Sequence, residues 1–81
     1  MMNKTFRGHV ILTGAALRDE DLGEKLILIV NVIENGRAVD YRATFDHGGR
    51  TIIGLVEKII PPDWEQNGVI PIVRVIRSLG S

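Results

Sequence analysis

Two apolar segments joined by Asn35-Gly36 constrain the fold of this chain more than any other feature. Residues 25–34 are apolar on both faces of an extended strand, and residues 38–45 alternate between apolar and polar side chains. Asn-Gly is the preferred pair for a two-residue type I′ turn. The sequence therefore predicts a β-hairpin. Four residues of its second strand are expected to point inward: Val39, Tyr41, Ala43 and Phe45.

The two ends of the chain also carry strand patterns. Residues 5–13 alternate in polarity, and residues 69–77 are apolar on both faces. Pro71 lies near the start of the last segment, and its missing N–H suits an edge or a bulge. Residues 14–24 combine helix-favouring residues with a run of acidic ones, so we expect a short irregular helix or a long loop there.

The segment 51–60 decides between two fold classes. On a helical wheel its six apolar residues fill one arc of about 160°, and the other four residues fill the opposite arc. This pattern favours a helix. Its five Ile and Val residues and the central Gly54 favour a strand instead, because β-branched residues and glycine lower helix propensity. Pro61-Pro62 ends the element in both cases.

With a helix at 51–60, the chain is an α+β protein, in which a four-stranded antiparallel sheet carries one or two helices on one face in a βαββαβ order. With a strand there, five strands in meander order form an all-β barrel of the SH3-like or OB-like kind. In both cases the 81 residues are expected to form a single domain, 1–81, because so short a chain cannot build two cores.

Composition excludes several classes of protein. The chain has no cysteine, so disulfides and thiolate metal sites are absent. No stretch reaches the 18 apolar residues of a membrane span, and the N-terminus lacks a signal-peptide pattern, so we expect a cytoplasmic protein without membrane contact. Ten basic and ten acidic residues give zero net charge, which disfavours non-specific nucleic-acid binding but permits a local basic patch.

The chemically active residue types are few, and each has a structural explanation. Asp46-His47 suits a general base, but Asp46 is better explained as a residue that fixes the local turn. Asp19, Glu20, Asp21 and Glu24 lack the spacing of an EF-hand and are interpreted as a solvated acidic loop. Gly48-Gly49 with Arg50 is only a weak anion-cradle signal. We therefore predict no catalytic residue, metal or cofactor, and favour a non-enzymatic protein while leaving a small enzyme open.

The apolar residues of the first hairpin strand predict an interface. In the α+β architecture they lie on the sheet face without helices, where so apolar a surface is unlikely to stay in water. Homodimerisation through this face is the simplest resolution. The expected contact residues are Ile27, Ile29 and Ile33, with Arg7 and Arg42 at the rim. Trp64 is interpreted either as a lid on the core or as an anchor for a partner.

These inferences predict a small protein-interaction or regulatory module that acts as a homo-oligomer, most simply a dimer, and binds another protein. The alternative is a nucleic-acid-binding module with a local basic patch. Its expected contacts are Arg7, Arg37, Arg42 and Arg50. The inward placement of Phe6, Tyr41 and Phe45 argues against this alternative, because nucleic-acid-binding sheets usually expose aromatic side chains for stacking.

Overall fold

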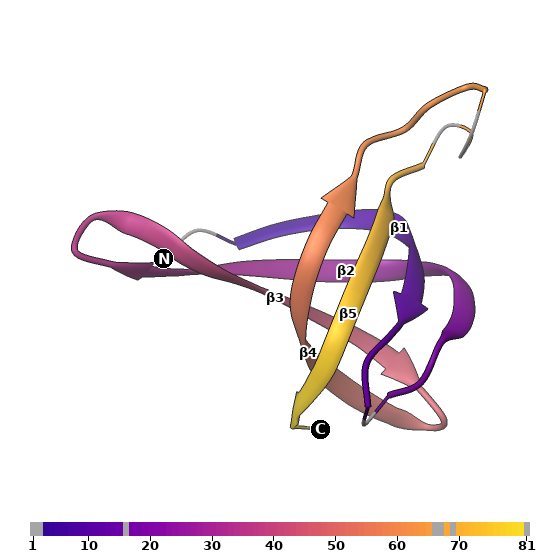
Figure 1. Ribbon diagram of the computed structural model, residues 1–81, viewed down its shortest axis with the longest axis horizontal. Helices are drawn as coiled ribbons and strands as arrows, with labels where there is room; N and C mark the ends of the chain where they lie inside the picture. The colour runs from indigo at the N-terminus through magenta and orange to yellow at the C-terminus, as the bar shows by residue number, and fades with distance from the viewer. Residues whose placement is uncertain (1–2, 16, 66–67, 69, 81) are drawn as a thin grey trace.

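Five β-strands account for most of the chain in the computed structural model, which describes residues 3–15, 17–65, 68 and 70–80 (Figure 1). They are β1 (Asn3–Leu12), β2 (Glu20–Glu34), β3 (Arg37–His47), β4 (Arg50–Ile60) and β5 (Ile72–Gly80). Helices are absent from the described residues, and these ranges therefore contain no helix long and apolar enough to cross a membrane.

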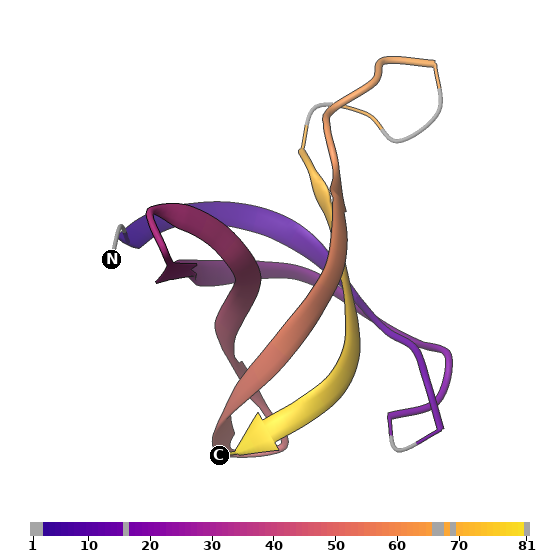
Figure 2. The ribbon, with the colours of Figure 1, turned by 60° about the vertical axis from the view of Figure 1, so that its left-hand side comes forward.

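The strands follow one another around a closed barrel in the order β1-β2-β3-β4-β5. Each consecutive pair is antiparallel. Because the number of strands is odd, β5 runs in the same direction as β1, and the barrel closes through a short parallel ladder from His9–Ile72 to Leu12–Val75. In Figure 2 the end of β1 and the first half of β5, which form this ladder, meet near the centre of the view. The α+β prediction is thus wrong, and the structure fits the all-β alternative.

The expected helix at 51–60 is a strand, and a β-bulge explains the misleading pattern. Ile52 and Val56 point into the barrel, with the buried Gly54 between them. The pairing of β4 with β5 then skips Glu57, so the inward row continues at Ile59 rather than at Lys58. The inward Ile52, Val56 and Ile59 are therefore spaced by four and three residues, which is the spacing of one face of a helix.

The predicted hairpin around Asn35-Gly36 is confirmed. Glu34 pairs with Arg37, and both turn residues have positive φ angles, 51° and 75°, as a type I′ turn requires. Gly48-Gly49 forms a second such turn, with φ angles of 61° and 76°, between the paired His47 and Arg50. No helix follows these glycines in the described chain, so the anion-cradle interpretation has no structural basis.

Within the described part of segment 14–24 the chain forms a loop and the start of β2. The amide of Arg18 donates to the carbonyl of Gly14 at 2.8 Å, which closes one turn without a helix. The first hairpin strand then begins at Glu20, five residues before the expected start. A bulge at Leu22, opposite the Val10–Ile11 step of β1, accommodates the additional residue.

The barrel core is one cluster of buried apolar side chains from all five strands. Its members are Val10, Leu12, Ile27, Ile29, Ala43, Phe45, Ile52, Val56, Val73 and Val75. On β1 and the second half of β3 these are residues expected to point inward. On β2 the expected faces are reversed, because Ile27 and Ile29 point into the core and are 0% and 4% exposed.

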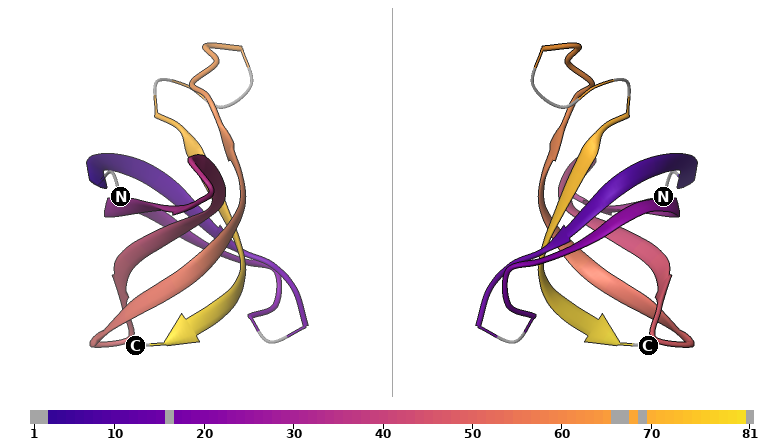
Figure 3. Two further views of the ribbon diagram at one scale, coloured as in Figure 1. Left: turned by 90° about the vertical axis from the view of Figure 1, so that its left-hand side faces the viewer. Right: turned by 90° about the vertical axis from the view of Figure 1, so that its right-hand side faces the viewer.

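Two parts of the molecule extend beyond this core. We call residues 30–41, the end of the β2–β3 hairpin, the arm. In Figure 1 it projects to one side, while the ends of β4 and β5 and their connection rise away from it. Both side views in Figure 3 show the same rise above the barrel. Val39 and Tyr41 were expected in the core but lie on the arm and are exposed, because the barrel ends before it reaches them.

Candidate functional site

A cleft opens where β3 and β4 separate. Their ladder runs from His47–Arg50 to Arg42–Leu55, and beyond that pair the arm and the end of β4 diverge. The space between them has a volume of about 470 Å³. One side is formed by β1, β2 and the arm: Lys4, Phe6, Arg7, Ile29, Asn31 and Tyr41. The other side is formed by the end of β4 and the β4–β5 connection: Ile59, Pro61, Pro62 and Pro71.

The cleft is a continuation of the barrel interior rather than a separate surface feature. Alternate residues of a strand share one face, so Asn31 follows the core residues Ile27 and Ile29 along β2. On β3, Tyr41 precedes the core residue Ala43 in the same way. The inward row of the core therefore continues into the cleft. There β4 no longer pairs with β3, so the apolar side chains are not covered by the opposite strand.

Local backbone features position the cleft walls. The amide of His9 donates to the carbonyl of Pro71 at 2.8 Å, which fixes the start of the β5 wall against β1. Gly8 permits this approach, because a Cβ there would lie 2.9 Å from Phe6 Cε2 and 3.3 Å from the Pro71 oxygen. On the β4 side, the bulge at Glu57 turns Ile59 toward the cleft.

The polar groups of the cleft are unevenly distributed. Two basic residues line it, Lys4 and Arg7, whereas its described lining has no carboxylate. Arg7 Nε lies 3.3 Å from Glu24 Oε1, but both side chains are largely exposed, so this pair is weak. The side-chain oxygen of Asn31 is buried and has no hydrogen-bond partner among the described residues. A buried acceptor without a partner is unfavourable, and a ligand that supplies a donor would relieve the cost.

The three isoleucines predicted to form an interface do not lie together on an open face. Ile27 and Ile29 belong to the core, because each pairs with a residue whose side chain points into the barrel, Phe6 for Ile27 and Ala43 for Ile29. Ile33 is 47% exposed and lies near the tip of the arm. Of the three predicted contact residues, only Ile33 is therefore exposed. The prediction that Ile27 and Ile29 lie on an open face is wrong, because both are buried in the core.

Trp64 does not form a lid on the core. It is 85% exposed, in the β4–β5 connection, where the amide of Glu65 donates to Asp63 Oδ1 at 2.8 Å and shapes a local turn. This exposure removes the lid interpretation, and the anchor interpretation stays a prediction. Trp64 lies two residues after Pro62 in the sequence, and Pro61 and Pro62 both line the cleft.

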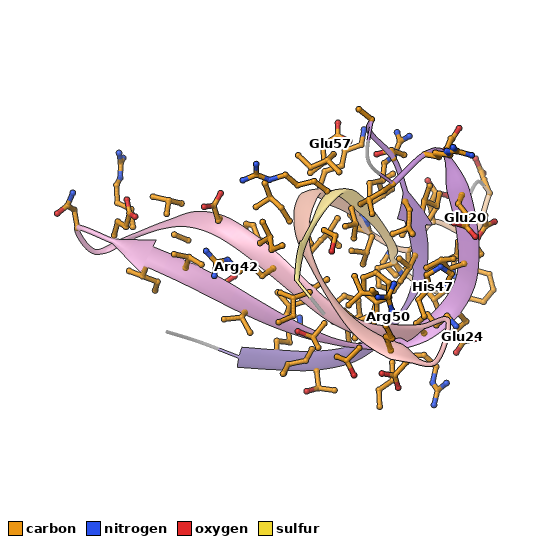
Figure 4. All side chains as sticks on the ribbon, turned by 90° about the horizontal axis from the view of Figure 1, so that it is seen from below. Glu20, Glu24, Arg42, His47, Arg50 and Glu57 are labelled. Carbon is orange, nitrogen blue, oxygen red and sulfur yellow. The ribbon has the colours of Figure 1, made fainter. Side chains whose placement is uncertain are left out.

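The predicted basic patch is dispersed over the molecule. Arg42 lies on β3 at the base of the arm, and Arg50 lies at the turn between β3 and β4, as Figure 4 shows. Arg37 lies at the tip of the arm, next to the Asn35-Gly36 turn. Of the four arginines expected to contact nucleic acid, only Arg7 lines the cleft.

Asp46 has a structural partner. Its Oδ1 accepts a hydrogen bond from the hydroxyl of Thr51 at 3.0 Å, across the β3–β4 pair next to the Gly48-Gly49 turn. This contact agrees with the interpretation of Asp46 as a residue that fixes the turn. His47 lies at the end of β3, beside Arg50 in Figure 4 and away from the cleft lining.

The acidic residues near the start of β2 pair with β1. Asp21 Oδ1 contacts His9 Nε2, and Glu24 contacts Arg7. The His9 hydrogen bond, followed by the Gly23 amide, lowers the pKa of Asp21 from its ordinary value of 3.8. Among the described residues, no group of three or more metal-ligating side chains is arranged to hold an ion.

Comparisons with known proteins do not narrow the function. No protein-family model matches the chain, and no curated protein or solved structure is significantly similar to it. The site must therefore carry the functional argument.

Sequence reasoning missed most of the cleft. Phe6 and Tyr41 were expected to point inward, and they do, but the interior is open where they lie. Ile59 was obscured by the helical pattern of its segment. One signal was present in the sequence, because Pro61-Pro62 and Pro71 bracket the β4–β5 connection, and prolines at strand ends often mark the point where pairing stops.

Proposed function

We propose that this protein is a protein-binding module whose cleft receives an apolar segment of another protein. The observation that carries the proposal is the 470 Å³ cleft at the mouth of the barrel, where seven of the ten lining residues are apolar or aromatic. Concave, mostly apolar sites with a few polar groups are typical binding sites, and barrel mouths often contain them. Trp64, exposed beside the proline wall, supplies a further anchor.

Protein is favoured over nucleic acid as the ligand. The zero net charge and the dispersed arginines do not produce the strong positive field that binding to phosphates requires. Phe6 and Tyr41 do line the cleft, but Ile59 and the three prolines opposite them offer no further aromatic surface for bases to stack on. We also propose that the module is non-enzymatic and acts in the cytoplasm, which is compatible with a chain that has no cysteine.

Homodimerisation stays a prediction and is not part of this proposal. It was expected on a face centred on Ile27, Ile29 and Ile33, and the burial of the first two removes that argument. The exposed Ile33 remains compatible with self-association through the arm.

Two matched substitutions on β4 test the proposed function. Ile59 and Ile53 are almost equally exposed, 37% and 38%, but only Ile59 lines the cleft. Random-sequence peptides displayed on phage would be selected on the wild-type protein, and their affinities measured by fluorescence anisotropy. We expect Ile59→Arg to weaken the selected peptides about tenfold or more, because it places a charge in an apolar site, and Ile53→Arg to leave them unchanged.

The same variants separate the two classes of ligand. An added arginine strengthens contact with a phosphate backbone, so a nucleic-acid site would bind labelled oligo-dT more tightly in Ile59→Arg, and the wild-type affinity would fall steeply with salt. That result would replace the proposal. The proposal would also be contradicted if every selected peptide bound the Ile59→Arg and Ile53→Arg variants with equal affinity, or if no peptide could be selected. Circular dichroism confirms that both variants keep the fold.

A further inference from the structure

The backbone beside the cleft has an unpaired strand edge. Residues 37–41 of β3 pair with β2 on one side, except for Val39, which a bulge opposite the Val32–Ile33 step leaves unpaired. In the described chain β4 leaves their other side at the Arg42–Leu55 pair. An open edge presents backbone N–H and C=O groups that can pair with another extended chain. Residues 56–60 of β4 are also paired on one side only, but Pro61-Pro62 follows directly and cannot donate. Of these two edges, the arm is therefore the better template.

A strand added to the arm would direct side chains into the cleft. Neighbouring strands of a sheet place their side chains in register on the two faces, and successive residues alternate between those faces. Tyr41 lies on the unpaired part of β3 and also lines the cleft. Every second side chain of an added strand would thus share the face of Tyr41 and enter the space opposite Ile59.

The polar groups of the cleft indicate the chemistry of such a segment. Lys4 and Arg7 line the cleft, whose described lining has no carboxylate. Because Arg7 already has a weak contact with Glu24 outside this lining, an acidic group on the ligand is complementary mainly to Lys4. The buried side-chain oxygen of Asn31 requires a donor, which a polar side chain of the ligand that enters the cleft can provide. The apolar side chains of the ligand would contact Ile59 and the proline wall.

We infer that the cleft binds an extended segment of a partner protein, with alternating apolar residues and at least one acidic residue, which adds to the arm as a further strand beside residues 37–41. This inference rests on the proposed function and specifies its mode of recognition. Main-chain pairing with the arm would supply affinity, and the cleft would select the alternate side chains.

Backbone methylation of a selected peptide tests the mode directly. Only every second N–H of an added strand faces the arm. N-methyl groups on the peptide residues whose N–H groups face the arm would therefore block pairing, whereas N-methyl groups on the residues between them would not. We expect one set to weaken binding about tenfold or more and the other to change it less than about threefold. Amide hydrogen exchange in residues 38–41 should also slow on binding, because these amides gain partners or cover.

Charge reversal tests the acidic requirement. Lys4→Glu should weaken peptides that carry an acidic residue by about fivefold, whereas Lys58→Glu, on β4 and outside the cleft lining, should not. Equal effects of the two variants would contradict the inference on charge.

Failure of this inference is distinguishable from failure of the proposed function. If peptides depend on Ile59 but tolerate both methylation patterns and leave residues 38–41 unprotected, the cleft binds protein without strand addition. If residues 38–41 become protected at high protein concentration without peptide, a second copy of the chain occupies the edge, which also overturns the inference. Loss of any dependence on Ile59 removes both proposals.

Discussion

Arg42 and Leu55 form the pair at which the β3–β4 ladder ends and the cleft begins. On one side of this pair the strands enclose the buried Ala43 and Ile52, and on the other side Tyr41 and Ile59 face an open space. A barrel closed over its whole length would cover these side chains. The cleft therefore results from where pairing stops, and the same separation produces the unpaired edge of the arm.

Close approach of β4 and β5 below the cleft depends on the lack of a side chain at Gly54. A Cβ atom at this position would lie 2.3 Å from Val75 Cγ1, which is far inside van der Waals contact, and Val75 is fully buried. We expect Gly54→Ala to lower the free energy of unfolding by about 1–3 kcal/mol, measured by urea denaturation. Gly80→Ala on β5 is the control, because its Cβ would meet no atom within 4 Å. Equal stabilities of the two variants would contradict the observed packing.

The hairpin and the approximate positions of β1 and β5 were predictable from local sequence, but the strand at 51–60 and the inward face of β2 were not. Residues 25–34 are apolar on both faces, so alternation alone cannot identify the buried row. Only the register decides it, because Ile27 pairs with Phe6 and Ile29 with Ala43. The register depends in turn on two bulges that no local pattern reveals: Leu22 is bulged against β1, and Val39 is bulged against β2.

The cleft was harder to predict for a related reason. Its position depends on where the neighbouring strands β3 and β4 cease to pair, which no local pattern shows. The bulge at Glu57 that directs Ile59 into the cleft also imitates a helical pattern in the sequence. Residue type identified Phe6 and Tyr41 as inward side chains, which is correct. Sequence alone did not show that the interior is open at their level.

The reversed face of β2 leads to a second stability prediction. Ile27→Ala should lower the free energy of unfolding by about 2–5 kcal/mol, because it leaves a cavity in a fully buried site. Ile33→Ala makes the same change at a position 47% exposed, and its cost should be below about 1 kcal/mol. Chemical denaturation of both variants measures the difference. Equal, small losses of stability in both variants would instead agree with the predicted open face, on which Ile27 and Ile33 lie together.

Trp64 provides a test of the β4–β5 connection. Since its side chain is 85% exposed, Trp64→Ala should change the free energy of unfolding by less than about 0.5 kcal/mol. The indole of the wild-type protein should be quenched by acrylamide nearly as efficiently as in the unfolded chain. A protected indole together with a clear loss of stability in Trp64→Ala would show instead that the residue covers the core.

The pair of His9 and Asp21 predicts how acid affects stability. The side-chain hydrogen bond from His9, and then the amide of Gly23 at 2.8 Å, lower the pKa of Asp21 below its ordinary value of 3.8. A carboxyl group whose pKa is lower in the folded state contributes stability above its unfolded pKa, and loses that contribution as the pH falls through the folded pKa. The loss should therefore occur below pH 3.8.

Nuclear magnetic resonance titration of the Asp21 carboxyl carbon measures this shift. We expect a midpoint below 3.8 in the wild type and a higher midpoint in His9→Ala, in which the amide of Gly23 still holds the carboxylate. Asp21→Asn cannot ionise, so acid unfolding of this variant should lack the corresponding proton uptake. The Asp21 side chain is largely exposed, so added salt should reduce the shift by screening the carboxylate. An unchanged midpoint in His9→Ala would show that the Gly23 amide alone lowers the pKa.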